Sequence, residues 1–149
     1  MRVVRYLERI QEMDIRVNDK IAERERILEL ATVITPTLSD MPKGGSTSDK
    51  VGNAGVKLAD IAREINNATD RFVDFRNEAI QLLEMLPPKE YNVLHKHYVL
   101  YQTFRAIAEE WTPKPLSERQ VYRIKAKALK HAQALLDEKE GVSENKKTE

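Results

Sequence analysis

Two long stretches, in which apolar residues recur at alternating intervals of four and three, constrain the fold of this 149-residue chain. They cover residues 3–33 and 56–86, and their spacing places the apolar side chains along one stripe of an α-helix. Polar residues interrupt the first stripe at Asp14 and Arg24. A buried polar residue there could fix the register of the helices, but we expect both residues to face water at the edge of the stripe. The stripe positions are Val3, Leu7, Ile10, Asp14, Val17, Ile21, Arg24, Leu28 and Ala31, then Leu58, Ile61, Ile65, Ala68, Phe72, Phe75, Ala79, Leu82 and Leu86. The pattern predicts an all-α fold with a long antiparallel helical hairpin that resembles a coiled coil.

The segment between these stretches, residues 35–55, has a different composition. It contains four of the five glycines of the chain, together with Pro36 and Pro42. Because glycine and proline disfavour helix interiors, we expect a flexible loop over residues 35–55. The segment lacks the spacing of a phosphate-binding P-loop, and no strand precedes it. We therefore assign residues 1–86 to one helical hairpin domain.

Both stretches also carry apolar residues outside the stripe. These residues are Tyr6, Met13, Ile27 and Leu30 in the first stretch and Val73, Ile80 and Leu83 in the second. A single antiparallel partner covers only a narrow seam, so a wider apolar face needs a second partner. Another copy of the chain or the C-terminal region could supply it. We expect a homodimer that forms through residues 1–86.

Residues 87–138 are predicted to form a second domain of shorter helices, followed by a flexible polar tail at 139–149. A helix is expected to open at Pro88, and Thr103 and Ser117 are expected to cap two later helices. The prolines of residues 112–116 form the turn between those two helices. The expected inward residues are Tyr91, Leu94, Tyr98 and Tyr101, then Phe104, Ile107, Ala108 and Trp111, then Val121, Ile124, Ala128, Leu129 and Ala132.

The last predicted helix, residues 117–136, is strongly basic. Residues 111–136 contain six Lys or Arg residues and one acid, a net charge of +5, whereas the whole chain carries +1. A helix, a turn and a second, basic helix form the helix-turn-helix plan, whose second helix reads the major groove. The outward residues near its start are candidate base readers, namely Glu118, Arg119, Tyr122 and Arg123. Candidate phosphate contacts are Thr103, Lys114, Ser117, Lys127 and Lys130. A helical hairpin that only caps the coiled coil fits the same spacing, so the residues alone leave both interpretations open.

Residues 86–136 resemble region four of bacterial sigma factors, which reads the −35 promoter element. The similarity lies in Leu86-Pro87-Pro88-Lys89-Glu90-Tyr91-Asn92-Val93-Leu94, then in Tyr101, Thr103, Ile107 and Ala108, and then in Ser117-Glu118-Arg119-Gln120-Val121-Tyr122-Arg123-Ile124 followed by Lys125-Ala126-Lys127-Ala128-Leu129-Lys130. The resemblance implies that residues 87–138 bind double-stranded DNA. The turn at 111–117 is longer than the usual turn of the family, and Tyr122 and Arg123 replace its common base readers. The base preference of the family is therefore not carried over, and the other sigma regions are missing.

The chain also resembles small phage-encoded late regulators of the ArpU/RinA-like type in its size, its helical N-terminal half and its sigma-like C-terminal helices. This resemblance implies a sequence-specific transcriptional regulator of phage or prophage genes, with bacterial RNA polymerase as a candidate partner. Two alternatives remain open. One is a phage small terminase subunit, which would assemble as a ring for DNA packaging. The other is a coiled-coil adaptor that binds polymerase and not DNA.

Several other function classes are not expected. The chain has no cysteine and therefore no disulfide or thiolate metal site. It has no apolar run of the ~20 residues that a membrane helix needs, and no secretory signal, so we expect the bacterial cytoplasm and no membrane partner. His95 and His97 are two residues apart and point to different faces of a helix, so we expect no metal or other cofactor. Trp111 is expected in the core, and no catalytic constellation indicates an enzyme.

Overall fold

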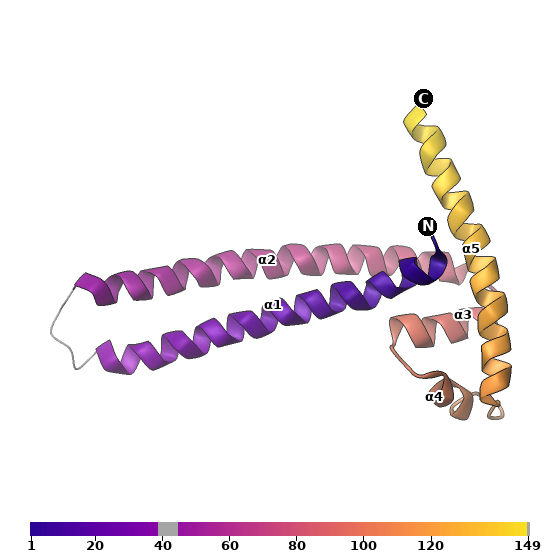
Figure 1. The fold of residues 1–149 in the computed structure, drawn as a ribbon, viewed down its shortest axis with the longest axis horizontal. Helices are drawn as coiled ribbons and strands as arrows, with labels where there is room; N and C mark the ends of the chain where they lie inside the picture. The colour runs from indigo at the N-terminus through magenta and orange to yellow at the C-terminus, as the bar shows by residue number, and fades with distance from the viewer. Residues whose placement is uncertain (39–44, 149) are drawn as a thin grey trace. The chain divides into compact units, whose positions relative to one another are not determined.

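A computed structural model describes residues 1–38 and 45–148 of the chain, and within these ranges it contains helices and no strand. The prediction of an all-α fold is thus confirmed. Figure 1 labels the helices in chain order. The labelled helices are α1 (Val3–Leu38), α2 (Gly45–Glu84), α3 (Pro88–Leu94), α4 (Phe104–Glu109) and α5 (Glu118–Thr148), and a π-helical turn (His95–Val99) lies between α3 and α4 in the chain.

Both long helices extend further into the segment that connects them than their sequence pattern indicated. The predicted flexible loop over residues 35–55 is wrong at both ends, because helix covers residues 35–38 and 45–55. Residues 39–44, the rest of that segment, lie outside the described residues. Glycine lowers helix propensity by about 1 kcal/mol per residue, but it does not forbid a helical backbone. None of the described glycines has a positive φ angle.

The end of α2 also differs slightly from its prediction. The helix ends at Glu84 instead of Leu86. The N–H groups of Met85 and Leu86 donate to the carbonyls three residues earlier, at 3.3 and 3.0 Å, which tightens the last turn. The residue before a proline is disfavoured in the helical region, so Pro87 accounts for this early end.

The described helices divide into two compact units, and residues 13–72 form one of them. In this unit α1 and α2 run antiparallel, with the Lys20 ammonium 3.2 Å from the Glu64 carboxylate. Val17, Ile61 and Ile65 are buried, as their stripe positions predict. The two polar interruptions, Asp14 and Arg24, are half-buried. The prediction that both residues face water is therefore only partly met. The Arg24 Nε atom is buried without a hydrogen-bond partner.

The other unit combines residues 1–12 with residues 73–149, so its boundary differs from the predicted division at residue 86. Gln133 of α5 contributes to this difference, because its side chain anchors the start of α1. The Val3 N–H donates to Gln133 Oε1 at 2.8 Å, and Gln133 Nε2 donates to the Met1 carbonyl at 2.9 Å. The ends of the hairpin helices therefore pack with the C-terminal helices as one unit.

The predicted flexible tail at residues 139–149 is wrong for residues 139–148, because α5 continues through them. Lys139 forms an ion pair with Glu78 of α2, and Glu140 lies 3.1 Å from the Met1 amino group. These two contacts anchor α5 past Leu136, where the predicted helix ends. Residue 149 lies outside the described residues.

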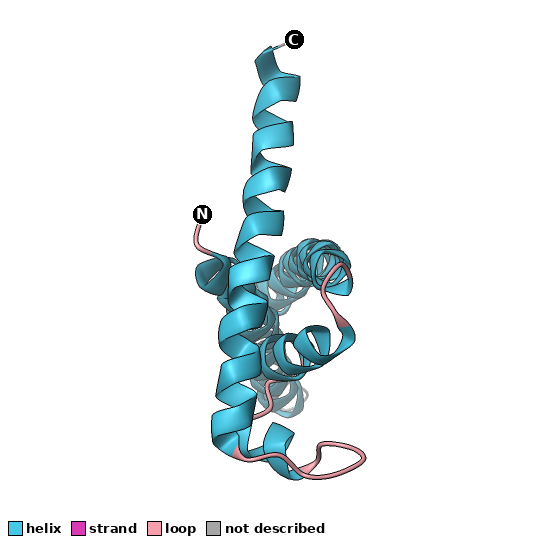
Figure 2. Cartoon of the chain, turned by 90° about the vertical axis from the view of Figure 1, so that its right-hand side faces the viewer, coloured by secondary structure: helices cyan, strands magenta, loops and turns pink. Residues whose placement is uncertain are grey.

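The C-terminal helices pack around a small core, which positions the start of α5. Figures 1 and 2 both show α3 and α4 beside the N-terminal half of α5, which continues past them. The buried residues of this core are Val93, Ile107, Ala108 and Val121, and the half-buried residues packed against them are Phe104, Trp111, Leu116 and Ile124. The prediction that Trp111 is a core residue is confirmed.

The segment between α3 and α4 departs from a regular helix. Residues His95–Val99 form a π-helical turn, and Tyr101 has a φ angle of 59°. A non-glycine residue in this left-handed region ends a helix, which is why Tyr101 is exposed and does not face inward, as its spacing indicated. Leu94 and Tyr98 are buried as predicted.

Candidate nucleic-acid interface

The start of α5 is held by a reciprocal capping arrangement between Ser117 and Gln120. The Gln120 N–H donates to Ser117 Oγ at 3.2 Å, and the Ser117 N–H donates to Gln120 Oε1 at 2.9 Å. This is the capping-box geometry that satisfies the free donors at a helix start. At the start of α4, the Ala106 N–H donates to Thr103 Oγ1 at 3.1 Å. Both predicted caps are confirmed, and they fix where the two helices begin.

The first half of α5 has one apolar face and one cationic face. Val121 and Ala128 are buried against the neighbouring helices. Arg119, Arg123 and Lys130 follow the 4- and 7-residue spacing of one helix face and are exposed on the opposite side. Among the described ion pairs, none involves these three cations. Their charges are therefore available to an anionic ligand.

The four predicted base readers lie within two turns at the start of α5. Glu118, Arg119, Tyr122 and Arg123 are all exposed, and Tyr122 is 48% exposed. Their donors and acceptors therefore face solvent together. An arginine can fork onto the guanine edge, and a glutamate can accept from a cytosine amine.

The predicted phosphate contacts fall into two groups. Lys114, Lys127 and Lys130 are exposed, in the loop before α5 and on α5 itself. The hydroxyls of Thr103 and Ser117 instead serve the helix caps, and Ser117 Oγ also donates to Gln120 Oε1 at 3.3 Å. The lysines are therefore better placed than the two hydroxyl residues to meet a phosphate.

A cluster of three rings and a lysine, which the sequence did not indicate, lies where α4 meets α5. His97 stacks on Phe104 with ring centroids 4.0 Å apart, and Phe104 lies 5.0 Å from the Tyr122 ring. The Lys125 ammonium lies 4.6 Å from the Phe104 centroid. His97 Nδ1 is 2.8 Å from the Gln102 carbonyl, and because that oxygen only accepts, Nδ1 carries the proton. This aromatic–lysine cluster connects the π-helical turn to the exposed start of α5.

The Glu90 carboxylate links α3 to the middle of α5. Glu90 is 8% exposed, and its two oxygens lie 2.9 and 2.8 Å from His131 Nδ1. A buried carboxylate needs such a partner, because desolvation without one is costly. Pro87, Lys89, Glu90 and Lys127 are among the residues that line a groove of about 570 Å³ beside this link. The groove brings Lys89, which was not a predicted site residue, close to the predicted phosphate contact Lys127.

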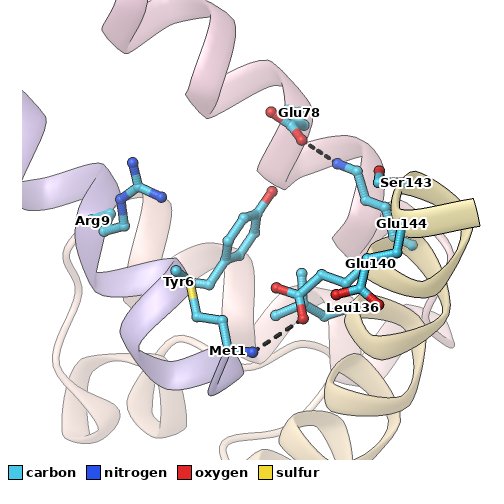
Figure 3. A pocket seen from close by; sticks show the side chains of 9 residues that line it. Met1, Tyr6, Arg9, Glu78, Leu136, Glu140, Ser143 and Glu144 are labelled. Atoms are coloured by element: carbon cyan, nitrogen blue, oxygen red, sulfur yellow. Dashed lines mark hydrogen bonds and ion pairs between the residues drawn. The ribbon is translucent and has the colours of Figure 1, made fainter. Parts of the chain in front are cut away.

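A second pocket, of about 470 Å³, lies where the ends of α1 and α2 meet α5 (Figure 3). Four of its charged groups form two ion pairs, Lys139 with Glu78 and the Met1 amino group with Glu140. Tyr6 lies among these pairs, and its hydroxyl is buried without a hydrogen-bond partner. These two ion pairs join α5 to the start of α1 and the end of α2.

The two histidines that sequence analysis considered as metal ligands are engaged separately. His95 stacks on Tyr91 with ring centroids 5.0 Å apart, and burial, with the nearby charge of Arg76, lowers the pKa of His95. His97 belongs to the aromatic–lysine cluster. Residues 1–38 and 45–148 hold no group of three or more His, Cys, Asp or Glu side chains that could bind a metal ion.

Within the same part of the chain, no helix is both long and apolar enough to cross a membrane.

The residues that sequence reasoning missed are joined by contacts between distant positions. Glu90 and His131 are 41 residues apart, and Val3 and Gln133 are 130 residues apart. Helical periodicity reports only which face a residue occupies, so it contains no signal for such pairs.

Comparison with protein-family models, with curated proteins and with solved structures finds no match to this chain.

Proposed function

We propose that this protein is a sequence-specific DNA-binding transcriptional regulator of phage or prophage genes, which reads the major groove with residues 117–136. One observation carries the proposal. The start of α5 exposes Arg119 and Arg123 opposite a buried apolar face, and no described carboxylate pairs with them. A major groove admits one helix and offers the acceptors that such side chains can bind.

In this proposal, the two kinds of exposed residue have different roles. Glu118, Arg119, Tyr122 and Arg123 contact base edges, because they lie in the first two turns of the helix. Lys114, Lys127 and Lys130 contact phosphates, which fixes the register of the helix but carries no sequence information. The capping box at Ser117 and the core around Val121 hold the helix start rigid, which preorganises the base readers.

The phage or prophage assignment rests on the resemblance to small late regulators and to region four of sigma factors. Bacterial RNA polymerase would then be a second partner, and the bacterial cytoplasm the place of action. Two alternatives, a small terminase subunit and a polymerase-binding adaptor, differ from the proposal in oligomer size and in DNA binding, respectively. The net charge of +5 on residues 111–136 favours a DNA-binding function over the adaptor.

The test compares Arg123→Ala with Lys130→Ala, using DNA fragments that the protein enriches from its source genome and random fragments of equal length. Arg123→Ala should lose about 1–3 kcal/mol on the enriched fragments and relax specificity at one base pair. Lys130→Ala should weaken binding to both kinds of DNA similarly, because it removes a phosphate contact. Fluorescence anisotropy at constant salt measures both effects. An equal loss on enriched and random DNA for Arg123→Ala contradicts the base-reading role.

A further inference from the structure

Lys125 differs from the other lysines of α5 in what surrounds it. Its ammonium lies 4.6 Å from the centroid of Phe104 and 5.7 Å from that of Tyr122. The residue is half-buried, whereas Lys127 and Lys130 are exposed. A cation at these distances is attracted by the faces of both rings. Lys125 therefore lies against two aromatic rings, unlike the candidate phosphate contacts Lys127 and Lys130.

The contacts of Lys125 converge on Tyr122, one of the predicted base readers. The Phe104 ring lies 5.0 Å from Tyr122 with an angle of 47° between the planes, and His97 stacks on Phe104 at 4.0 Å. Phe104 itself packs against the buried core of the C-terminal helices. The Tyr122 ring is thus braced by a fixed aromatic ring and by a cation, while 48% of the residue is exposed.

A rigid, exposed aromatic ring suits one chemical group of the major groove in particular. The thymine C5-methyl is an apolar group on a surface otherwise dominated by hydrogen-bond donors and acceptors, and apolar side chains recognise it by contact. Tyr and Trp rings supply large contact areas at a low cost in conformational entropy. Bracing lowers that cost further, because the ring is already ordered before DNA binds.

We propose that Lys125 is a positioning residue that, with Phe104, holds the Tyr122 ring in place to contact a thymine methyl group. This inference rests on the proposed function, because it needs α5 to enter a major groove. Two consequences follow. Removal of the Lys125 charge should reduce discrimination at a thymine, and it should not change the number of phosphates that the protein neutralises.

The experiment uses the full-length protein and DNA that it selects from a random pool. Each thymine of the selected site is replaced in turn by deoxyuridine, which lacks only the methyl group. The wild-type protein should lose about fourfold in affinity at one position or more, the equivalent of one buried methyl. Tyr122→Phe should keep this sensitivity because it keeps the ring, and Tyr122→Ala should lose it.

Lys125→Met and Lys127→Met are the matched pair, because both remove a charge from α5 and keep an unbranched side chain. Lys125→Met should reduce the deoxyuridine effect and leave the salt dependence of binding unchanged. Lys127→Met should keep the deoxyuridine effect and lower the slope of log K against log salt by about 0.9, the value for one phosphate. Circular dichroism and thermal unfolding check that each variant is folded.

Three other results overturn the inference in distinguishable ways. A selected site whose thymines all tolerate deoxyuridine refutes the role of Tyr122, while the proposed function stands. A slope that falls by about 0.9 in Lys125→Met, with the deoxyuridine effect intact, makes Lys125 a phosphate contact instead. If no sequence is enriched and random DNA does not bind, the proposed function fails, and this inference fails with it.

Discussion

At the scale of single residues, Tyr6 shows how burial changes the chemistry of one group. The residue is 6% exposed, its ring lies 5.1 Å from that of Phe75, and its hydroxyl has no hydrogen-bond partner. Burial, reinforced by the charge of Glu78, raises the pKa of Tyr6 to about 12. The neutral form is thus favoured in the folded state, while the unfolded chain ionises near pH 10.

We predict that Tyr6→Phe changes how stability depends on pH. Between pH 10 and 12 the unfolded state has lost the Tyr6 proton and the folded state has kept it, so the wild-type protein loses about 1.4 kcal/mol of stability per pH unit from this group. Tyr6→Phe removes that loss, and near pH 7 it should raise the free energy of unfolding by about 1 kcal/mol, because a buried hydroxyl without a partner is costly. Urea unfolding at several pH values measures both effects.

Tyr98 offers a second variant for the same experiment. Burial and the charge of Glu8 also raise the pKa of Tyr98, so Tyr98→Phe should reduce the high-pH loss in the same direction. If Tyr6→Phe is less stable at pH 7 and loses stability above pH 10 as steeply as the wild-type protein, the account of Tyr6 is wrong.

At the scale of secondary-structure elements, the start of α5 depends on one side chain. Ser117 accepts from the Gln120 N–H at 3.2 Å, and Gln120 Oε1 accepts in return from the Ser117 N–H. These two hydrogen bonds between Ser117 and Gln120 place the first turn of α5 directly after the proline-containing loop. The same turn carries Glu118 and Arg119, so the cap also sets where the candidate base readers lie.

We predict that Ser117→Ala lowers the free energy of unfolding by about 1 kcal/mol, the usual cost of a lost N-cap. Ser117→Asp is the matched control, because an aspartate caps a helix as well as a serine does. It should keep wild-type stability but weaken DNA binding, since it adds a negative charge near the proposed interface. Chemical denaturation and anisotropy measure the two effects. If Ser117→Ala is as stable as the wild-type protein, the cap does not stabilise α5.

At the scale of the whole molecule, the hairpin helices leave apolar side chains exposed. Ile15, Leu28, Leu30 and Val56 are each at least 45% exposed, and Val73 is 43% exposed, although buried residues such as Val17 and Ile61 lie on the same helices. Two helices that face only each other cannot cover more than one stripe. A second copy of the chain would cover this surface, and a twofold dimer is the usual way to do so.

We predict that the protein is a dimer at micromolar concentration, with a mass by light scattering of about twice the 17.2 kDa of one chain. Ile15→Glu should shift this mass toward the monomer, because it places a charge on the exposed apolar surface. Asn67→Glu adds the same charge at an exposed polar position of the hairpin and should leave the mass unchanged. A wild-type monomer refutes the dimer, and a ring of eight or more copies supports the terminase alternative.

Local rules determined much of this fold from the sequence. The heptad stripes predicted both long helices, and the residue types at Thr103 and Ser117 predicted two helix starts, because capping needs only neighbours three residues away. The inward face of α5, with Val121 and Ala128, followed from helical periodicity. These predictions succeeded because each depends on residues close together in the chain.

Contacts between distant residues decided the rest. Gln133 anchors the start of α1, Lys139 pairs with Glu78 to extend α5, and Lys125 turns inward to the Phe104 and Tyr122 rings. The sequence placed Lys125 in a basic stretch but could not show that an aromatic ring 21 positions earlier would lie beneath it. Periodicity records which way a side chain points on its own helix, and only the packing of helices decides what it meets there.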